Sequence, residues 1–580
     1  MMKPPPLIQR LIPILYEDEQ FLAIGKPAGV DVGGLPDEQA TGLVELVMTL
    51  RGRNETLHPI NRLSRFESGV LLLGKNPGAA ARIRTMLKSF RMEQEYVAVV
   101  NGRMNKPMLI LDSRRDSEEK KKVEKGRRPT RNPRSAKRTA ASAALGIRTA
   151  LRRIEQGEHR TLIRCETTAP TTHALRAQLR SMGLRLVGDR VHDRAPRLMA
   201  HEDTCLHLSR VRLTTAGQKN SMAIRSPAPA GFAVALRGER DVQRLLHAAL
   251  VRRLPCLLEP QTDSCRLLTG PAEGLSGLIA EKYGPVVVLQ VLEASPRWLE
   301  ALPDVARWYR DLLRVQAVYV KRFVRDRTQL NDDLQEALRS PKPLLGEPAP
   351  PQVEINERGL RFAIRPYDGF SVGLFLDQRD NRGRIREMSR GKDVLNLFAY
   401  TCGFSVAAAV GGAKSTVSVD VSPKHLEWGR TNFTLNGIGL AVDLAEHQFI
   451  RSDAMEFLRR AERQGKEFDI IILDPPSFAH GRKSKGDFSI LEDLAGLVRS
   501  AGEVLRSGGV MMVSTNHRKL SRRGLLDRVR QGCGSRRCEV LEAPPLPPDF
   551  AVDNDHSKSV FVRLGGSPAP HQSDAANLHS

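Results

Sequence analysis

Residues 393–412 read DVLNLFAYTCGFSVAAAVGG. The apolar run at the start predicts a buried strand, and the small residues that follow predict a tight turn and then a helix from Phe404. In an open α/β sheet, the turn after such a strand is where a nucleotide-like cofactor binds. Gly403 is the one glycine in this turn and no Gly-Lys-Ser/Thr follows it, so the stretch fits neither a P-loop nor a redox dinucleotide fingerprint.

The same alternation of strand and helix continues through residues 353–563. Strands are expected at STVSVD, HQFIRSD, FDIIILD and GGVMMVS, and helices are expected from Pro423, from Ala454 and around 490–505. Strands that alternate with helices of this length favour parallel βαβ units. We therefore predict that this part of the chain folds as a doubly wound, Rossmann-like α/β sheet.

Acidic residues stand at the ends of the predicted strands. Asp420 ends the second strand, Asp453 follows the third, and Asp474 opens an Asp-Pro-Pro-Ser-Phe segment after the fourth. Because the carboxyl ends of parallel strands meet at one edge of a sheet, these carboxylates are expected to share a cleft. A carboxylate at the second strand end can accept both hydroxyls of a ribose, and one at the third can reach an adenine amine. Each acid alone could be structural, whereas the set predicts a cofactor site.

Length and charge bound the class of protein. The 580 residues exceed what one hydrophobic core supports, so three or four domains are expected. A net charge of +24 favours a polyanionic partner, with nucleic acid the first candidate. No apolar run approaches the ~20 residues of a membrane span, and Glu17, Asp18 and Glu19 interrupt the apolar stretch near the N-terminus. We therefore expect neither a membrane segment nor a signal peptide.

Seven cysteines are spread along the chain without a Cys-x-x-Cys pair. Cys533 and Cys538 have four residues between them and no second pair to complete a tetrahedral site, so a zinc ribbon is not expected. We predict that the protein holds no metal and that its thiols are reduced and buried, as in a cytoplasmic protein.

Composition also predicts the domain boundaries. The segment SPAPAGF closes an expected N-terminal α+β domain at 1–235, and the linker SPKPLLGEPAPPQ precedes the doubly wound domain at 353–563. Residues 236–345 between them are expected to form a small α/β domain. The tail at 564–580 is of low complexity and is predicted to be disordered.

A strongly basic stretch interrupts the N-terminal domain. Residues 113–138 hold twelve Lys and Arg against four acids, which predicts a loop or a disordered arm. The arm is either a solvated insertion or a non-specific tether for phosphates, and both interpretations stay open.

Three stretches of the C-terminal half carry a family resemblance. They are GLFLDQRDNR (373–382), VLNLFAYTCGFSVAAAVGGAKSTVSVDVSPKHLEWGRTNFTLNG (394–437) and DIIILDPPSF (469–478). They resemble class I S-adenosylmethionine-dependent methyltransferases, and among these the bacterial 23S rRNA base methyltransferases. The resemblance covers about residues 353–563, and residues 265–325 resemble the small α/β domain that precedes the catalytic domain in this group. It implies S-adenosylmethionine as the cofactor and 23S rRNA or a large-subunit precursor as the substrate.

The resemblance also implies roles for individual residues. The implied cofactor-binding set is Asp377, Gln378, Arg379, Asn396, Tyr400, Gly403, Asp420, Asp453 and Asp474. Of these, Asp377 to Arg379 would lie near the methionine end, Asp420 at the ribose and Asp453 at the adenine. The implied catalytic set is Asp474, Pro475, Pro476 and Asn516, and the implied base contacts are Phe478 and His517. His517 could equally be a surface histidine, and Phe478 could simply pack.

Two methylation chemistries occur in the resembled group. Methylation of cytosine at carbon 5 needs a cysteine thiolate that adds to carbon 6, and the family carries it in a Ser-Cys-Ser type segment. The matching residues 514–518 read Ser-Thr-Asn-His-Arg, with no cysteine. Guanine N7 already has an exposed lone pair and needs only alignment with the methyl–sulfonium axis. Residues 514–518 and 549–562 resemble the guanine-N7 half of a bifunctional 23S rRNA methyltransferase, so guanine N7 is favoured and cytosine C5 is the alternative.

The N-terminal half resembles RluA-type pseudouridine synthases over about residues 10–235. The stretches LHPINRLSRFESGVLLLGKN (57–76) and APTTHALRAQLRSMGLRLVGD (169–189) carry much of the resemblance. The family motif His-Arg-Leu-Asp-x-x-Thr-Ser-Gly reads NRLSRFESG here, so Ser64 stands where the family has its catalytic aspartate. Breaking and remaking a glycosidic bond needs a carboxylate, and Glu67 is expected to point elsewhere.

Other family positions are retained. Arg62, Tyr96 and Arg176 match substrate-binding positions, the last two being the base-stacking tyrosine and the arginine that pairs with the aspartate. We therefore expect an RNA-binding platform without isomerase activity. A working pseudouridine synthase and a non-catalytic ribosome-assembly factor stay as alternatives, although the complete set of acidic strand ends favours an enzyme.

Overall fold

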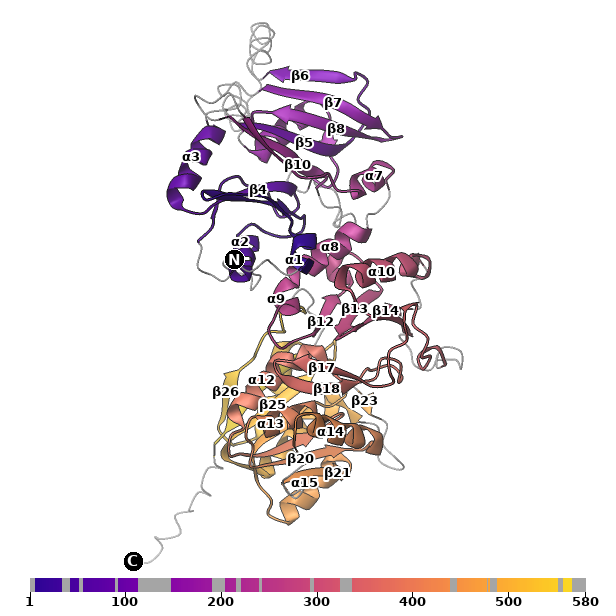
Figure 1. Ribbon diagram of the computed structural model, residues 1–580. Helices are drawn as coiled ribbons and strands as arrows, with labels where there is room; N and C mark the ends of the chain where they lie inside the picture. The colour runs from indigo at the N-terminus through magenta and orange to yellow at the C-terminus, as the bar shows by residue number, and fades with distance from the viewer. Residues whose placement is uncertain are drawn as a thin grey trace, which may run out of the picture. The chain divides into compact units, whose positions relative to one another are not determined.

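The structure is a computed structural model (Figure 1). It describes residues 6–33, 42–51, 56–88, 92–112, 148–169, 171–189, 204–214, 221–238, 242–292, 297–323, 336–438, 446–476, 478–479, 488–550 and 557–565. The basic arm predicted at 113–138 and the tail beyond residue 565 lie outside these ranges. The chain divides into two compact units, 1–255 with 273–276 and 256–272 with 277–580. The finer boundaries predicted from composition stay a prediction.

The first unit is built on one mixed sheet. Its strands run in the order β1 (Ile14–Glu17), β2 (Phe21–Lys26), β4 (Ser68–Gly74), β10 (Leu206–Thr214), β5 (Met92–Asn101), β8 (Arg160–Thr167), β7 (Arg148–Gln156) and β6 (Met108–Asp112). Three short strands pair off this path, namely β3 (His58–Pro59), β9 (Arg185–Leu186) and β11 (Ser221–Arg225). The pair β4 and β10 is parallel and the other pairs are antiparallel, which fits the predicted α+β class.

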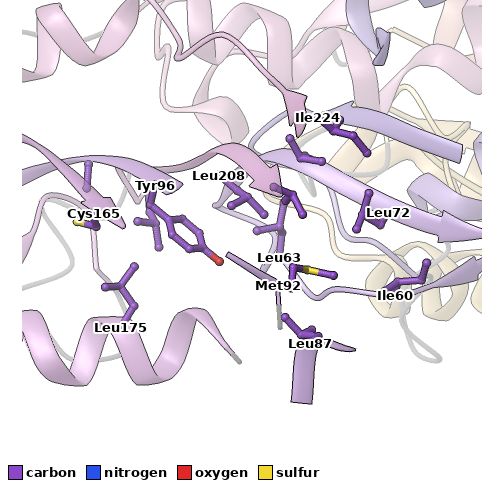
Figure 2. Close-up of a cluster of buried hydrophobic side chains, with 14 of the residues drawn as sticks. Ile60, Leu63, Leu72, Leu87, Met92, Tyr96, Cys165, Leu175, Leu208 and Ile224 are labelled. Atoms are coloured by element: carbon purple, nitrogen blue, oxygen red, sulfur yellow. The ribbon is translucent and has the colours of Figure 1, made fainter. Parts of the chain in front are cut away.

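Helices flank this sheet and its turns. They are α1 (Pro6–Leu11), α2 (Leu43–Leu50), α3 (Pro77–Lys88), α6 (Thr172–Ser181), α7 (Gly231–Leu236), α8 (Val242–Arg252) and α9 (Leu254–Leu257). Alternate residues of β5 face opposite sides, so Tyr96 and Ala98 enter the main core with Leu175 of α6, while Val99 packs with Phe232 of α7. Figure 2 shows Tyr96 and Leu175 within that main core.

The second unit begins with a small α/β sheet. Its strands run in the order β12 (Ser264–Leu268), β13 (Leu278–Tyr283), β14 (Val286–Leu292), β15 (Ala317–Phe323) and β16 (Leu345–Gly346). The parallel pair β14 and β15 is joined through helix α10 (Arg297–Leu313). A hairpin of β17 (Val353–Glu357) and β18 (Leu360–Ile364) follows. Strands and a helix thus occupy the region where the sequence predicts a small α/β domain.

A seven-stranded sheet forms the rest of the second unit. Its order is β21 (His447–Arg451), β20 (Ser415–Asp420), β19 (Asp393–Leu397), β22 (Phe468–Leu473), β25 (Leu505–Thr515), β27 (Lys558–Leu564) and β26 (Cys538–Glu542). The first five strands are parallel, and β27 runs antiparallel to both of its neighbours. Strand order reverses between β19 and β22, which creates a topological switch point at their carboxyl ends. The prediction of a doubly wound sheet is confirmed.

Helices cover both faces of the seven-stranded sheet. They are α12 (Arg379–Met388), α13 (Gly403–Val410), α14 (Pro423–Leu435), α15 (Ala454–Arg463), α16 (Ile490–Glu503) and α17 (Arg522–Cys533). Ile470 and Ile472 of β22 pack with α12 and α13, whereas Ile471 and Leu473 pack with α15, α16 and α17. A sheet buried on both faces explains why its strands read as continuous apolar runs. Among the described residues, no helix has the length and apolarity to cross a membrane.

Candidate active site

The turn after β19 has an unusual backbone. Phe398, Tyr400 and Cys402 all have positive φ, at 58°, 49° and 61°. The left-handed region is unfavourable for residues with a Cβ and costs on the order of 1 kcal/mol each, so this strain is held by the surrounding structure. Gly403, the predicted turn glycine, has no positive φ. The sequence placed the turn correctly but carried no signal of which residues set its conformation.

Asp420 fixes this turn from the neighbouring strand. Its Oδ2 accepts the backbone N–H of Tyr400 and its Oδ1 accepts that of Ser422, both at 2.8 Å. His425 Nδ1 lies 3.5 Å from Oδ1. Each carboxylate oxygen has a second lone pair, so Asp420 can bind ribose hydroxyls while it holds the turn. Val421 follows at the strand end with 64% of its surface exposed, which offers an apolar face beside the carboxylate.

Tyr400 joins the turn to the loop that precedes α12. Its hydroxyl donates to Ser371 Oγ at 2.9 Å, and its ring lies 5.3 Å from that of Phe375, which is 50% exposed. Thr401 Oγ1 donates to the carbonyl of Gly373 at 2.6 Å. Gly373 has a φ of +115°, and a Cβ there would meet the Trp428 ring at 2.2 Å, so only glycine fits this close approach.

Two other predicted cofactor contacts have structural partners. Asn396 is buried under the turn, where its Nδ2 donates to Ser405 Oγ of α13 at 2.9 Å. Asp453 is exposed and caps α15, accepting the N–H of Glu456 at 3.0 Å. Both lie at the strand ends expected from the sequence, and their contacts in the structure position helices.

The carboxyl groups of Asp377 and Asp474 lie close enough to interact electrostatically. Ser557 Oγ donates to Asp377, and Ser514 forms a hydrogen bond with Asp474. Burial, together with the nearby Asp377 charge, raises the pKa of Asp474 to about 6 against the opposing effect of the Ser514 hydrogen bond. Asp474 therefore changes protonation close to neutral pH, which suits a group that exchanges or shares a proton with a substrate.

A chain of buried amides and hydroxyls supports this pair. Gln378 Nε2 donates to Ser514 Oγ at 2.7 Å. Asn381 Nδ2 donates both to Gln378 Oε1 at 2.6 Å and to Ser559 Oγ at 2.8 Å. The chain connects the start of α12 with β25 and β27, so the predicted residue Gln378 acts through Ser514 on the position of Asp474. The sequence reasoning missed Asn381 and Ser559, which lie 178 residues apart in the chain.

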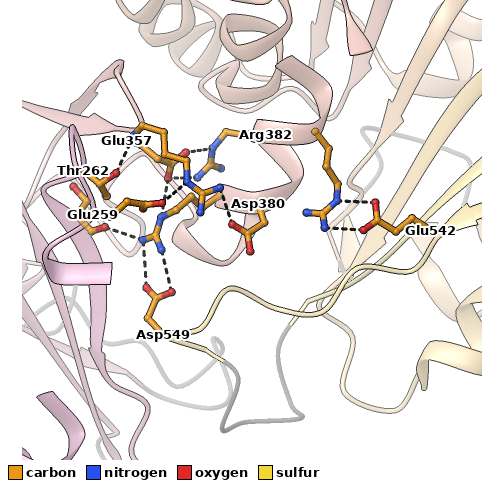
Figure 3. Close-up of polar contacts among 11 residues, drawn as sticks. Glu259, Thr262, Glu357, Asp380, Arg382, Glu542 and Asp549 are labelled. Atoms are coloured by element: carbon orange, nitrogen blue, oxygen red, sulfur yellow. Dashed lines mark hydrogen bonds and ion pairs between the residues drawn. The ribbon is translucent and has the colours of Figure 1, made fainter. Parts of the chain in front are cut away.

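Arg379, predicted as a cofactor contact, has buried protein partners. Its guanidinium is 1% exposed and binds Asp549 through Nη1 at 3.0 Å and Nη2 at 3.3 Å, and Nη2 also donates to the Ser264 carbonyl at 2.8 Å. Asp549 in turn accepts the backbone N–H of Arg266 at 2.9 Å, and the Arg266 guanidinium covers the Phe550 ring at 4.4 Å. Figure 3 shows Asp549 together with Glu357 and Arg382, which form a second buried pair at 2.7 Å. Arg379 thus belongs to a buried ionic clamp that anchors residues 547–550.

The remaining predicted base contacts follow β22 and β25. Pro475 is buried and Pro476 exposed, directly after Asp474. The backbone of Phe478 pairs with Ser489 in the short hairpin of β23 (Phe478–Ala479) and β24 (Phe488–Ser489). The Phe478 side chain lies outside what the structure describes.

Asn516 and His517 follow the adjacent strand. Asn516 is exposed, while His517 is 8% exposed and its backbone N–H donates to Thr515 Oγ1 at 3.0 Å. Burial lowers the pKa of His517, helped by the charges of Lys519 and Lys558. At neutral pH this imidazole is therefore uncharged. Because β22 and β25 are parallel neighbours, Asn516 and Asp474 leave the sheet at the same edge.

Exposed basic side chains extend this edge. Arg518 and Lys519 come directly after His517, and Arg522 and Arg523 open α17, whose first turn carries no acid. A positive rim of this kind favours a polyanion next to the candidate base site. Within the described residues, no group of three or more His, Cys, Asp and Glu side chains could hold a metal ion.

The N-terminal pocket corrects one sequence prediction. The prediction that Glu67 points away from this site is wrong. The Glu67 N–H donates to the Ser64 carbonyl at 3.1 Å, and the resulting turn directs the Glu67 side chain toward Ser64. Its Oε2 accepts the backbone N–H of Ser64 at 2.7 Å and the hydroxyl of Thr172 at 3.1 Å, and its Oε1 lies 2.9 Å from Arg176 Nη2. Glu67 is fully buried, so a carboxylate pairs with the family's arginine from a different position.

The other N-terminal predictions fall on both sides of the surface. Arg62 and Ser64 are exposed, whereas Tyr96 is 2% exposed and its hydroxyl donates to Gln94 Oε1 at 2.9 Å. Burial and the nearby Glu67 charge raise the pKa of Tyr96. Tyr96 is thus part of the core seen in Figure 2 and has no open ring face for a base.

Comparison with known proteins supports the same division of the chain. Residues 333–562 match the family of S-adenosylmethionine-dependent methyltransferases, and residues 20–181 match the RNA pseudouridylate synthase family. The chain is 34% identical to ribosomal RNA large subunit methyltransferase I of Erwinia tasmaniensis over 272 residues, which are 46% of this chain and 65% of that protein. It is 42% identical to methyltransferase K/L of a Psychrobacter species over 185 residues, 32% of this chain and 22% of that protein. It is 34% identical to methyltransferase K of Neisseria meningitidis over 244 residues, 41% of this chain and 65% of that protein.

The chain therefore covers less than two thirds of the length of these relatives. The family matches confirm both resemblances, the methyltransferase class of the C-terminal part, and S-adenosylmethionine as its cofactor.

Proposed function

We propose that this chain, which joins a methyltransferase domain to a domain of the RNA pseudouridylate synthase family, methylates a base of large-subunit rRNA in the cytoplasm. The observation that carries the proposal is the meeting of the strained turn at 398–402, Asp420 and Asp474 at one switch point of a doubly wound sheet. The names of the similar proteins support rRNA as the substrate class. The positive rim at Arg518, Lys519, Arg522 and Arg523 supports it independently.

At the cofactor end, the chain offers a polar and an apolar contact side by side. Asp420 can accept ribose hydroxyls, and the exposed Val421 can pack against the adenine ring. Tyr400 and Phe375 close the other side of the turn. When bound, S-adenosylmethionine supplies an electrophilic methyl group on a sulfonium sulfur.

At the target end, the chain can orient a base but offers no thiol. Residues 514–518 lack cysteine, and Cys402 is fully buried, with burial raising its pKa to about 12. A thiolate adduct, as needed for cytosine C5, therefore has no candidate nucleophile among the described residues of this edge. Asp474, Asn516 and Pro476 can hold a purine in line with the methyl group, which favours guanine N7.

A second candidate is methylation of an exocyclic base amine. The observation that favours it is the Asp474 carboxyl, whose pKa of about 6 leaves a carboxylate at neutral pH that can accept an amine hydrogen. The two candidates use the same site and differ in which edge of the base faces Asp474.

A nucleoside assay separates these products. Purified protein is incubated with methyl-labelled S-adenosylmethionine and undermodified 23S rRNA, and the digested nucleosides are resolved by mass spectrometry. Labelled 7-methylguanosine is expected, and a labelled exocyclic amine would select the second candidate. Labelled 5-methylcytidine, or no label, would contradict the proposal. Asp474→Asn should remove the label, while Asp469→Asn, on the same strand at its other end beside Arg506, should keep it.

For the N-terminal domain, we propose RNA binding without isomerisation. The support is that Glu67, the carboxylate beside Arg176, is fully buried and that Tyr96 is closed off. Pseudouridine counted in the same digest should stay unchanged, and an increase would show that this pocket opens to substrate.

A further inference from the structure

Two thiols meet at the far end of α17 from the candidate active site. Cys533 is the last residue of this helix and Cys538 the first residue of β26, with four residues between them. Both are free, Cys533 is buried and Cys538 is partly exposed. The two side chains pack in the same apolar cluster, where a hydrogen bond joins the Cys533 thiol to the Cys538 sulfur.

The loop between the cysteines is fixed in a shape that keeps them together. The Arg536 guanidinium donates to the carbonyls of Gly565 at 3.1 Å and Leu505 at 3.4 Å, and also to that of Gly502. Gly534 turns the chain with a φ of +60°. Gly532 lies so close to α16 that a Cβ there would meet the Val498 side chain at 2.6 Å. These contacts hold the loop between Cys533 and Cys538 in place.

The surroundings make Cys538 the attacking thiol. The hydrogen bond from Cys533, together with the Arg530 charge, lowers the pKa of Cys538 to about 7 against the opposing effect of burial. The thiolate is the reactive form of cysteine, and β26 is an edge strand, which leaves Cys538 within reach of small solutes. Cys533 lines a cavity of about 150 Å³ together with Arg499, Glu503 and Arg536.

We propose that Cys533 and Cys538 form a reversible disulfide when the protein meets a peroxide. The Cys538 thiolate attacks one peroxide oxygen, the O–O bond breaks, and a sulfenic acid and hydroxide result. The hydrogen bond to Cys538 and burial raise the pKa of the Cys533 thiol, so it loses its proton only as it attacks the sulfenic sulfur. The S–S bond then forms and a second hydroxide leaves. The two thiol protons convert both hydroxides to water, so two thiols are oxidised and one peroxide is reduced. A dithiol reductant reverses the step by exchange.

The other cysteines provide an internal comparison. Cys165, Cys205, Cys256, Cys265 and Cys402 are all buried. Burial raises the pKa of Cys165, Cys256 and Cys402, which disfavours their thiolates. Oxidation by a small excess of peroxide should therefore select the pair at 533 and 538.

Peptide mapping tests the proposal on the full chain without any activity assay. Trypsin cleaves after Arg530, Arg536 and Arg537, which places Cys533 in peptide 531–536 and Cys538 in peptide 538–558. After hydrogen peroxide and blocking of remaining thiols, mass spectrometry should find these two peptides joined, with two hydrogens removed, and dithiothreitol should separate them. Unlinked peptides, or a link that involves any of the other five cysteines instead, would overturn the proposal.

Two variants test the order of attack. In Cys533→Ser, peroxide should leave Cys538 as a sulfenic acid that a dimedone probe labels, because the resolving thiol is missing. In Cys538→Ser, Cys533 should stay reduced under the same exposure. Equal labelling of the remaining cysteine in both variants would overturn the assignment of Cys538 as the attacking thiol. Since the readout is the mass of two peptides, failure here is independent of the proposed methyl transfer.

Discussion

The resembled family has an aspartate at the position of Ser64. In this chain the carboxylate beside Arg176 comes from Glu67 instead. The motif that resembles the pseudouridine synthases predicts the absence of a carboxylate at position 64, and that absence is correct. The prediction that Glu67 points elsewhere is wrong, because the β-turn between the two residues brings its longer side chain back to the Ser64 N–H. A motif comparison relates residues by their position along the chain. The Arg176 guanidinium pairs with the carboxylate that lies closest to it in space.

Glu67→Gln should destabilise the N-terminal unit. The change leaves the buried Arg176 with Asp189 at 3.5 Å as its remaining acidic partner within the described pocket. Breaking a buried ion pair costs about 3–5 kcal/mol, and the retained Asp189 places the expected loss of unfolding free energy near the lower end. Urea unfolding measures it. Ser64→Ala, at an exposed position of the same turn, is the matched control and should change the value by less than about 0.5 kcal/mol. Equal stability of both variants would contradict a structural role for Glu67.

Asp474→Asn should gain stability while it loses methyl transfer. The folded protein raises the pKa of Asp474 to about 6, from an ordinary value of about 4. The wild-type protein therefore loses stability as pH rises from 4 to 6, where the carboxyl must ionise in a site that favours its neutral form. The amide variant escapes this loss and should be more stable by about 2–3 kcal/mol well above pH 6, since one pKa unit corresponds to about 1.4 kcal/mol, with no difference below pH 4. Unfolding curves across that range decide the sign, and a less stable variant at pH 7 would contradict it.

At the scale of elements, the sequence predicted the helices and strands better than the contacts between them. The hydrophobic periods of 2 and 3.6 residues are local properties of the sequence and predict where strands end. Acidic residues at those ends, such as Asp420 and Asp474, could therefore be identified. The bonds that hold Asp474 could not be predicted, because Gln378 and Ser514 lie 136 residues apart and Asn381 and Ser559 lie 178 apart. The positive φ of Tyr400 and Cys402 could not be predicted either, because a left-handed turn is normally predicted from a glycine.

Lys321 shows how the small sheet reaches the cofactor turn. From β15, its Nζ donates to the carbonyls of Gly369 at 2.6 Å and Phe370 at 3.3 Å, within the loop whose Ser371 holds Tyr400. A hydrogen bond from a charged donor contributes about 1.5–3 kcal/mol, so Lys321→Met should weaken S-adenosylmethionine binding about tenfold. Calorimetric titration measures this. Lys282→Met removes a similar bond, to the Asp263 carbonyl at 2.7 Å, but touches no part of that loop and should bind normally. Equal weakening in both variants would contradict the positioning role.

For the whole molecule, the effect of the 24 excess positive charges on RNA binding depends on where they lie. Many described arginines are neutralised, such as Arg379 by Asp549 and Arg506 by Asp469. The exposed Arg518 and Lys519 stand beside the candidate base site instead. Composition predicted a polyanionic partner, but only the fold could show which cations are engaged inside the protein.

Arg518→Gln with Lys519→Gln should therefore weaken RNA binding and its dependence on salt. Removing one cation that neutralises a phosphate reduces the slope of log affinity against log salt by about 0.7–0.9, so the slope of the double variant should fall by about 1.4–1.8. Filter binding to 23S rRNA fragments over a salt series measures the slope. The control is Arg459→Gln with Arg463→Gln, which removes the same charge from the exposed face of α15. A slope that falls equally in both would show that net charge, and not this rim, determines binding.

The clamp around Asp549 also bears on how such a protein can be inherited. Arg266, Arg379 and Asp549 come from three distant stretches, and one apolar cluster contains Tyr283 of the small sheet together with Phe362 of the hairpin and Val406 of α13. A gene rearrangement that broke the chain in the proline-rich linker would leave a buried aspartate short of a partner and half of a core exposed to water. The smallest segment that could be transferred to another protein with its chemistry intact therefore starts upstream of β12. A gene rearrangement must move the small sheet and the seven-stranded sheet together.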